Sequence, residues 1–232
     1  MISFCQSLKA QRLNGLIPVI PDIKLVSPKH GDLLHGRSPL EAARLLERLG
    51  APALSVVTEP NDFGGSLELL ASIANAVRIP VLRKDFITCE DDLRQTLEHG
   101  AAAVLLISSC LEPLQLSSLY HAAVAFGLEP LVETHTEQEL LFAARLHPQL
   151  VGVNNRDILT LEKDDGTVAT TEKLAALAPA GALLISESGI TTPQQARAAL
   201  NCGADAVLVG TALWQAADLG QYYLALSRGE DG

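Results

Sequence analysis

The sequence is poor in cysteine, in positive charge and in long apolar runs, and each shortage excludes a class of protein. Its four cysteines lie far apart and show no C-x-x-C spacing, which argues against a zinc site and a secreted disulfide scaffold. Lysine and arginine number 17 against 27 aspartates and glutamates. The net charge of −10 argues against nucleic-acid binding and against a polybasic membrane patch. A small phosphorylated metabolite can still bind at a locally positive site.

Targeting and cofactor signals are also missing. No apolar run reaches the roughly 18 residues of a membrane span. The N-terminal stretch MISFCQSLKAQRLNG places basic residues after a short apolar start, the reverse of the order in a signal peptide. No His, Asp or Glu cluster has metal-ligand spacing, and the G-x-G-x-x-G dinucleotide fingerprint is absent. We therefore expect a cytoplasmic protein without a metal or a nucleotide cofactor.

What the sequence does contain is a regular alternation of short apolar runs and amphipathic segments. Several runs are nearly continuously apolar, which is typical of parallel strands buried on both faces. Glycines stand where the C-caps of four helices are expected, at Gly50, Gly100, Gly127 and Gly203. The expected strands cover 18–24, 53–57, 81–84, 103–107, 130–133, 150–154, 183–187 and 206–209, and the expected helices 39–49, 66–77, 90–99, 113–126, 137–146, 171–177, 192–200 and 219–227.

This repeat predicts an α/β fold, a single (β/α)8 barrel domain over residues 1–232. A short N-terminal segment, 1–17, precedes the first strand. A doubly wound open sheet is the alternative, but eight units of about 25–30 residues without a low-complexity linker favour the barrel. In such barrels the active site lies where the strands end and the following loops begin.

Polar side chains gather at the carboxyl ends of the expected strands and are scarce at the amino ends, which is the strongest sign of an enzyme. Asp22 and Lys24 are two residues apart on a strand and therefore point to the same side. They form either a buried structural ion pair or the floor of an active site. The other residues at these ends are Lys84, Asp85, Glu133, Asn154, Asn155, Arg156, Glu187, Ser188, Gly189, Gly210 and Thr211.

Two lysines and two glutamates are expected to share the mouth of the barrel: Lys24, Lys84, Glu133 and Glu187. Their proximity would push their pKa values apart, and burial together with the neighbouring lysine would lower the pKa of Lys84. Such a set suits general acid–base catalysis, although a structural salt-bridge network is the alternative. His135 falls where a solvated or capping role is expected.

The sequences SESGI and LVGTAL follow the last two expected strands, and the corresponding loops bind phosphate in many barrels. Gly189 and Gly210 would let backbone N–H groups approach the anion, while Ser188 and Thr211 would add hydroxyls. In the alternative interpretation the glycines only form tight turns.

One aromatic residue stands near the expected mouth. Phe63 precedes Gly64-Gly65, so we expect a flexible loop whose ring either stacks on a ring substrate or packs locally. Trp214, after the last expected strand, is predicted to lie in the core.

Eight segments, in order along the chain, carry a resemblance to a known family: PDIKLVSP, LSVVTEPNDFGGSLELL, PVLRKDFI, AAVLLI, EPLVETHTEQEL, VGVNNRDILTLE, SESGI and AVLVGTALW. Together they resemble the indole-3-glycerol phosphate synthases from about residue 4 to residue 214. The resemblance implies a carbon–carbon lyase (carboxy-lyase) of tryptophan biosynthesis. Its substrate would be 1-(2-carboxyphenylamino)-1-deoxyribulose 5-phosphate, and its products indole-3-glycerol phosphate, CO2 and water. The resemblance implies no cofactor or metal, and association with other tryptophan-pathway enzymes is a further expectation.

The resemblance also assigns roles to individual residues. Lys84 matches the lysine that protonates the departing oxygen, and Glu133 matches the general base. Lys24 matches the lysine that holds the carboxylate or phosphate region of the substrate. Asn154, Glu187 and Ser188 match positions that orient the substrate. The phosphate clamp is matched by Gly189, Gly210 and Thr211, and Ser27 lies in the matching loop. Phe63 and Arg156 are the residues expected to contact the aromatic end of the substrate.

The chain departs from the family pattern at two places. Asp22 stands where the family usually has glutamate, and withdrawal of a carboxylate by about 1 Å can cost on the order of 100-fold in rate. The family also has a longer N-terminal segment with a helix over the barrel mouth, so residues 1–17 are expected to leave the site wet or open to another chain. Two alternatives therefore stay open: a diverged lyase or isomerase for another amino-sugar phosphate, and a non-catalytic phosphate-ligand-binding subunit.

Overall fold

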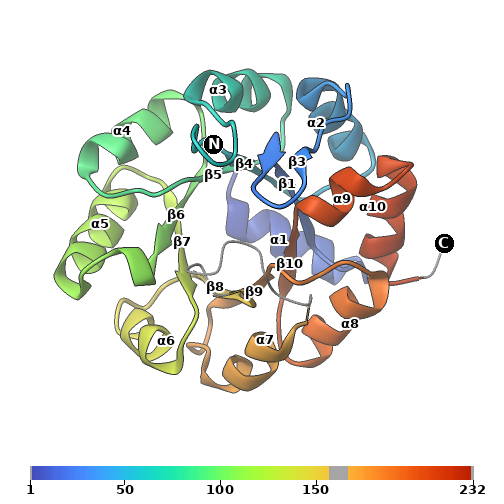
Figure 1. Ribbon diagram of the computed structural model, residues 1–232. Helices are drawn as coiled ribbons and strands as arrows, with labels where there is room; N and C mark the ends of the chain where they lie inside the picture. Colours follow the sequence, from blue (N-terminus) through green and yellow to red (C-terminus); the bar gives the residue numbers. More distant parts are fainter. Residues whose placement is uncertain (1, 157–166, 231–232) are drawn as a thin grey trace.

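The computed structural model describes residues 2–156 and 167–230. Eight parallel strands close into a barrel in the order β1, β4, β5, β6, β7, β8, β9, β10 and back to β1. Helices surround the ring of strands, as Figure 1 shows. The predicted (β/α)8 barrel is confirmed. The end of the segment VGVNNRDILTLE, residues 157–162, lies outside the described residues.

The elements have the following bounds. The barrel strands are β1 (Val19–Ile23), β4 (Leu54–Val57), β5 (Val81–Lys84), β6 (Ala103–Ile107), β7 (Glu129–Thr134), β8 (Leu150–Asn154), β9 (Leu183–Glu187) and β10 (Ala206–Val209). The helices are α1 (Phe4–Leu13), α2 (Pro39–Arg48), α3 (Leu67–Ala76), α4 (Glu90–Glu98), α5 (Pro113–Ala125), α6 (Glu137–Ala144), α7 (Ala169–Leu174), α8 (Pro193–Asn201), α9 (Thr211–Gln215) and α10 (Leu219–Arg228). Within the described residues there are also two 3-10 turns, η1 (Ser108–Cys110) and η3 (Ala175–Leu177), and a hairpin of β2 (Val26–Ser27) with β3 (Gly31–Asp32). Every expected strand and helix is present, whereas α1, α9 and the hairpin were not predicted.

Local side-chain chemistry explains where the helices begin and end. The Ser38 hydroxyl accepts the N–H of Glu41 at the start of α2, and Pro39 occupies the first turn. Thr192 caps α8 in the same way, with Pro193 after it. The four glycines predicted as C-caps all have left-handed φ angles, between 82° and 109°: Gly50, Gly100, Gly127 and Gly203.

Alternate residues of each barrel strand point inward, and their character changes along the strand. On β5, Leu82 belongs to the apolar barrel interior, and Lys84 lines a cavity at the carboxyl end. On β7 the same succession runs from Leu131 to Glu133. Because side chains alternate with a period of two, the polar residues at the strand ends share one mouth above an apolar interior.

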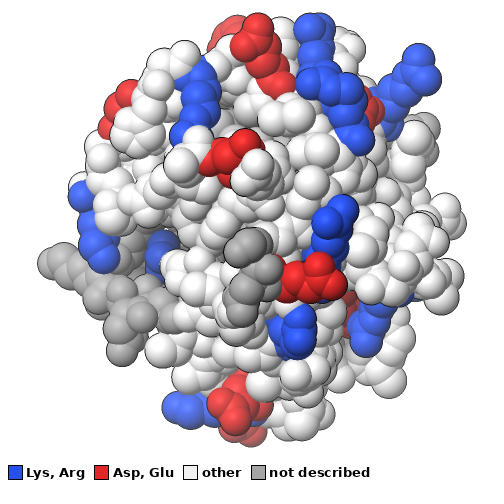
Figure 2. Space-filling view, turned by 90° about the vertical axis from the view of Figure 1, so that its right-hand side faces the viewer, with Lys and Arg blue, Asp and Glu red and all other residues white. Residues whose placement is uncertain are grey.

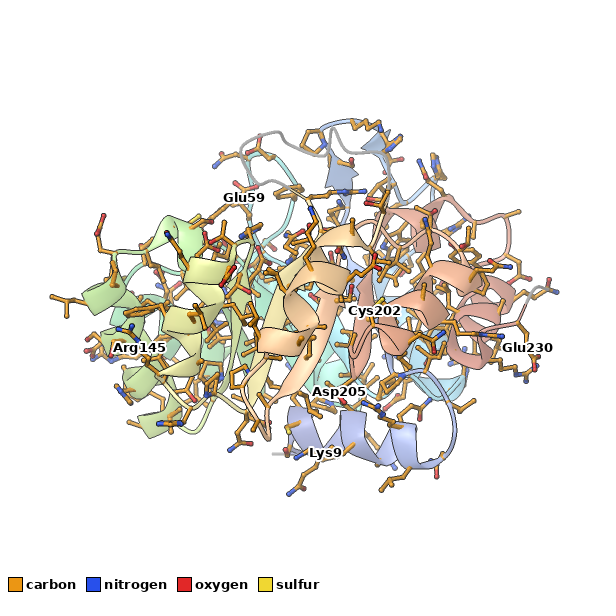
Figure 3. The ribbon with its side chains drawn as sticks, turned by 90° about the horizontal axis from the view of Figure 1, so that it is seen from below. Lys9, Glu59, Arg145, Cys202, Asp205 and Glu230 are labelled. Carbon is orange, nitrogen blue, oxygen red and sulfur yellow. The ribbon has the colours of Figure 1, made fainter. Side chains whose placement is uncertain are left out.

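Helix α1 closes the opposite end of the barrel. Its residues Phe4, Cys5 and Leu8 are buried against the apolar barrel interior. The N–H groups of Phe4 and Cys5 donate to the Glu129 carboxylate, at 2.7 and 2.9 Å, where β7 begins. Figure 3 shows α1 at one end of the molecule and the β2–β3 hairpin at the other. Helix α1 therefore does not line the mouth, and the expectation that the site is wet or completed by another chain stays a prediction.

The outer surface carries charge of both signs. On the face seen in Figure 2, acidic and basic side chains are scattered among neutral ones, without a continuous basic surface in the described part. Among the described residues, no helix combines the length and the apolarity that a bilayer crossing would need.

Candidate active site

A cavity of about 510 Å³ opens at the carboxyl ends of the barrel strands, and its size suits a small-molecule ligand. The predicted site residues that line it are Asp22, Lys24, Phe63, Lys84, Glu133, Asn154, Arg156, Ser188, Gly189, Gly210 and Thr211. Two predicted residues are not part of the lining. Ser27 is buried in the short strand β2, and Glu187 is fully buried behind the lining.

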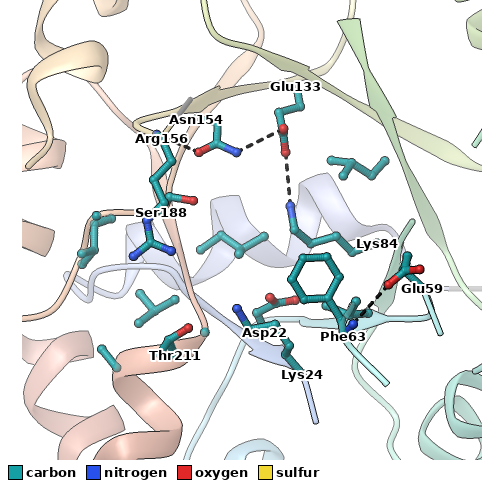
Figure 4. A pocket seen from close by; sticks show the side chains of 18 of the residues that line it. Asp22, Lys24, Glu59, Phe63, Lys84, Glu133, Asn154, Arg156, Ser188 and Thr211 are labelled. Atoms are coloured by element: carbon teal, nitrogen blue, oxygen red, sulfur yellow. Dashed lines mark hydrogen bonds and ion pairs between the residues drawn. The ribbon is translucent and has the colours of Figure 1, made fainter. Parts of the chain in front are cut away.

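Lys84 lies at the centre of the polar contacts in this cavity. Its Nζ donates to Glu133 Oε2 at 3.2 Å and to Glu187 Oε2 at 3.1 Å. Asn154 Nδ2 donates to the other oxygen of Glu133 at 3.1 Å, as Figure 4 shows. Because both oxygens of Glu133 are engaged, its carboxylate has a fixed orientation beside the ammonium.

These contacts reverse the predicted pKa shift of Lys84. Burial disfavours the ammonium, but the Glu133, Glu187 and Asp22 carboxylates outweigh it, so the pKa of Lys84 is raised. The prediction that burial and Lys24 lower this pKa is therefore wrong. Burial also opposes the charge of Glu133, yet the nearby ammonium keeps its pKa below the usual value. Burial, reinforced by the Glu133 charge, raises the pKa of Glu187 to about 8.

Glu187 occupies a slot that exists because residue 152 is glycine. A Cβ at Gly152 would lie 2.1 Å from Glu187 Oε1, far inside van der Waals contact. Within the described residues, this buried oxygen has no hydrogen-bond partner. An unpartnered carboxyl oxygen favours the neutral acid over the carboxylate, in agreement with the raised pKa of Glu187.

Asp22 lies on the floor of the cavity beside β10. Its Oδ1 accepts the Ser55 hydroxyl at 2.6 Å, and a Cβ added to Gly210 would lie 3.1 Å from Oδ2. The carbonyl of Asp22 accepts the indole N–H of Trp214 at 2.8 Å. Trp214 is fully buried, which confirms its predicted place in the core.

The loop that carries Phe63 is held by a residue that sequence analysis did not single out. The Glu59 carboxylate accepts the N–H groups of Asn61, Asp62 and Phe63 at 2.8, 2.7 and 3.1 Å. The Phe63 ring lies over the ammonium of Lys24, 5.4 Å from the ring centroid. The loop that was expected to be flexible is therefore anchored at both Glu59 and Lys24. A carboxylate two to four residues before a turn is the signal that could have indicated this anchor.

The segment after β9 has an unusual backbone. Ser188 and Gly189 have φ angles of 62° and 71°, both in the left-handed region. A Cβ at Gly189 would lie 2.4 Å from the carbonyl oxygen of Thr167, so only glycine fits. Strain of this kind in a non-glycine residue such as Ser188 is concentrated at functional sites. At the end of the neighbouring strand β10, the buried Thr211 hydroxyl has no partner among the described residues.

His135 is a half-buried neighbour of Glu133 that contacts two carboxylates, so it has neither the solvated nor the capping role that was expected. Its side chain is 12% exposed. Nε2 lies 3.4 Å from Glu133 Oε1, and Nδ1 lies 3.5 Å from Glu139 Oε2. Burial opposes the imidazolium, but Glu139 and Glu133 outweigh it and raise the pKa of His135. The available signal was the sequence ETH, which places His135 two residues after Glu133 and just beyond the end of the strand.

Comparison of the chain with known proteins identifies its family. A family model described as indole-3-glycerol phosphate synthase matches residues 1–226. The chain belongs to the indole-3-glycerol phosphate synthase family. The synthase of Thermococcus kodakarensis is 46% identical over 200 residues, which cover 86% of this chain and 87% of that protein. The synthase of Pyrococcus abyssi is 45% identical over 201 residues, 87% of each chain, and that of Shouchella clausii is 40% identical over 224 residues, 95% of this chain and 87% of that protein.

Family membership confirms the resemblance seen in the sequence and makes the chain a carboxy-lyase of tryptophan biosynthesis. It does not favour the diverged lyase or isomerase, or the non-catalytic subunit. The alignment with the Thermococcus protein covers nearly equal shares of both chains. Chain length therefore does not set this protein apart from that relative.

Proposed function

We propose that this chain converts 1-(2-carboxyphenylamino)-1-deoxyribulose 5-phosphate into indole-3-glycerol phosphate, CO2 and water, with Lys84 as general acid and Glu133 as general base. One observation supports these roles above all. The Lys84 ammonium lies in the cavity between Glu133 and Glu187, with a carboxylate of fixed orientation at 3.2 Å. A proton donor and a proton acceptor therefore face the same small volume.

The chemistry needs a donor first. When the ring carbon attacks the carbonyl carbon of the deoxyribulose, the carbonyl oxygen becomes an alkoxide, and Lys84 gives it a proton. Loss of CO2 follows. Lys84, reprotonated from solvent, then gives a second proton to the new hydroxyl, which leaves as water. Alkoxide and hydroxide are strong bases, so an ammonium with a raised pKa still protonates them while staying charged between turnovers. Glu133, ionised because its pKa is lowered, takes up the proton released as the indole forms.

The two ends of the substrate would bind on opposite sides of this pair. We assign the phosphate to Gly189, Gly210 and Thr211, and the Thr211 hydroxyl without a partner among the described residues supports that choice. At the other end, the Phe63 ring and Arg156 both line the cavity and would contact the anthranilate ring. Lys24 would hold the carboxylate or phosphate region of the substrate, and Asn154 would orient its middle. Ser27 is left out of the phosphate site because it does not line the cavity.

The direct test adds the carboxyphenylamino-deoxyribulose phosphate and follows the fluorescence of the indole product. The wild-type protein should produce it. Lys84→Ala should lose about 10²- to 10⁴-fold in kcat, the usual range for a general acid, while still binding the substrate. Lys9→Ala is the matched control, because Lys9 is exposed on α1 at the far end of the barrel (Figure 3). A wild-type rate for Lys84→Ala would refute the acid assignment, and a wild-type protein that makes no product would refute the function.

We also infer a cytoplasmic location, supported by the biosynthetic role of the family. Association with other tryptophan-pathway enzymes is a further proposal. Co-purification of this chain from its own cells would test it, and a chain that elutes alone at physiological concentration would count against it.

A further inference from the structure

We propose that His135 is a positioning residue for this reaction: its imidazolium bridges Glu139 and Glu133 and holds Glu133 ionised and aimed at Lys84. The inference rests on the proposed function, in which Glu133 is the base. His135 lies outside the cavity lining, so it would act through Glu133 and not by touching the substrate.

The geometry follows from β7. Glu133 lies on β7, and His135 directly follows the end of that strand at Thr134. Its Nε2 faces Glu133 Oε1 at 3.4 Å, and its Nδ1 faces Glu139 Oε2 at 3.5 Å. Both ring nitrogens are buried, and neither has a hydrogen-bond partner within the described residues. These distances are longer than those of ordinary hydrogen bonds, so the interaction energy comes mainly from the attraction of opposite charges.

Two carboxylates on opposite sides of the ring select its protonated form. A neutral imidazole has one N–H and one lone pair, so one of its nitrogens would turn a lone pair toward a carboxylate. The imidazolium presents an N–H to each. Burial opposes the charge, but Glu139 and Glu133 outweigh it and raise the pKa of His135.

Glu139 is well placed to hold the outer side of the ring. Its Oε2 accepts the backbone N–H of His135 at 2.7 Å, and its own N–H donates to Thr136 Oγ1 at 3.2 Å, at the start of α6. The Glu139 side chain is 22% exposed, whereas that of Glu133 is 2% exposed. The ring therefore separates a solvent-facing carboxylate from the buried base.

The charges around the ring balance in this arrangement. Lys84 and His135 supply two cations, and Glu133 and Glu139 supply two anions, because Glu187, with its pKa raised to about 8, is the neutral acid at neutral pH. Removing the imidazolium leaves one cation for two anions. The pKa of Glu133 would then rise, and the base would be protonated more readily. The titratable and charged groups that face or adjoin the ring are Glu133 on β7, Glu139 on α6, Glu187 on β9, Lys84 on β5 and Cys110 on η1.

The test is the pH profile of His135→Gln. Glutamine can still offer an N–H to Glu133 but carries no charge. The acid limb of kcat/KM should move to higher pH by about one unit, which is about a tenfold loss on that limb. The imidazolium is present only below the raised pKa of His135, so the two profiles should converge at alkaline pH. His121→Gln, at an exposed site on α5, is the matched control.

A second measurement does not depend on that variant folding. The imidazole NMR signals of His135 are assigned in the wild-type spectrum as those that shift when Glu139→Gln is introduced. It should titrate above the ordinary value of about 6.5, and at lower pH in Glu139→Gln. Superimposed activity profiles, an equal loss at every pH, or a ring already neutral near pH 6 would each overturn the inference. Absence of product from the wild-type protein would instead refute the proposed function, and the NMR titration would still decide the state of the ring.

Discussion

Gly152→Ala should damage the site through one side chain alone. Gly152 lies on β8, and its φ is not among the positive values, so alanine fits its backbone without strain. The added Cβ would lie 2.1 Å from Glu187 Oε1 and 3.2 Å from the carboxyl carbon. Normal contact requires a separation more than about 1 Å longer, so the Glu187 carboxyl must move. The neighbours in the closed barrel leave it little room.

The size of the effect can be worked from the contact that is lost. Glu187 Oε2 holds the Lys84 ammonium at 3.1 Å, and a displaced carboxyl would let that ammonium shift. A misplacement of about 1 Å in a catalytic group costs on the order of 100-fold in rate, which is the loss of kcat that we expect. Overpacking should cost about 1–3 kcal/mol of unfolding free energy, offset by about 0.5–1 kcal/mol because alanine suits a strand better than glycine.

Steady-state indole formation measures the first effect and urea unfolding the second. Glu187→Asp supplies the matched background, because its shorter side chain leaves space for the new methyl group. Gly152→Ala should therefore cost little when Glu187→Asp is already present, and the two losses should not multiply. Multiplicative losses, or a wild-type kcat in Gly152→Ala, would refute the reasoning.

Three further predictions concern other parts of the molecule. Asp22→Glu should leave turnover equal or improved, and a sharp loss measured with the proposed substrate would indicate a pocket built for another ligand. Glu59→Gln should raise KM more than it lowers kcat in steady-state assays, because three loop N–H groups lose a charged acceptor worth about 1.5–3 kcal/mol; an unchanged KM would count against a loop anchor. Phe4→Ala should lower the unfolding free energy by about 3–5 kcal/mol in urea and leave kcat unaltered, because α1 lies at the other end of the barrel; a changed kcat would contradict that separation.

Local patterns in the sequence were enough to predict the barrel. Apolar runs, capping residues such as Ser38 and C-cap glycines such as Gly127 act over a few residues, so they can be read without the fold. Strand periodicity also predicted that Asp22 and Lys24 point to one side. The polar residues were predicted to gather at the carboxyl ends of the strands. These features depend on backbone geometry, which neighbouring residues determine.

Only the tertiary structure determines the distances between side chains from different strands. The pKa of Lys84 depends on Glu133 and Glu187, which are brought to it by closure of the ring. No local rule could show that α1 fills the far end of the barrel, or that His135 meets a carboxylate on each side. Sequence by itself determined most of the residues that reach the mouth, but not that Glu187 lies behind the lining. Electrostatic and steric contacts fall off within a few ångströms, so which of those residues act on one another was decided by the closed barrel.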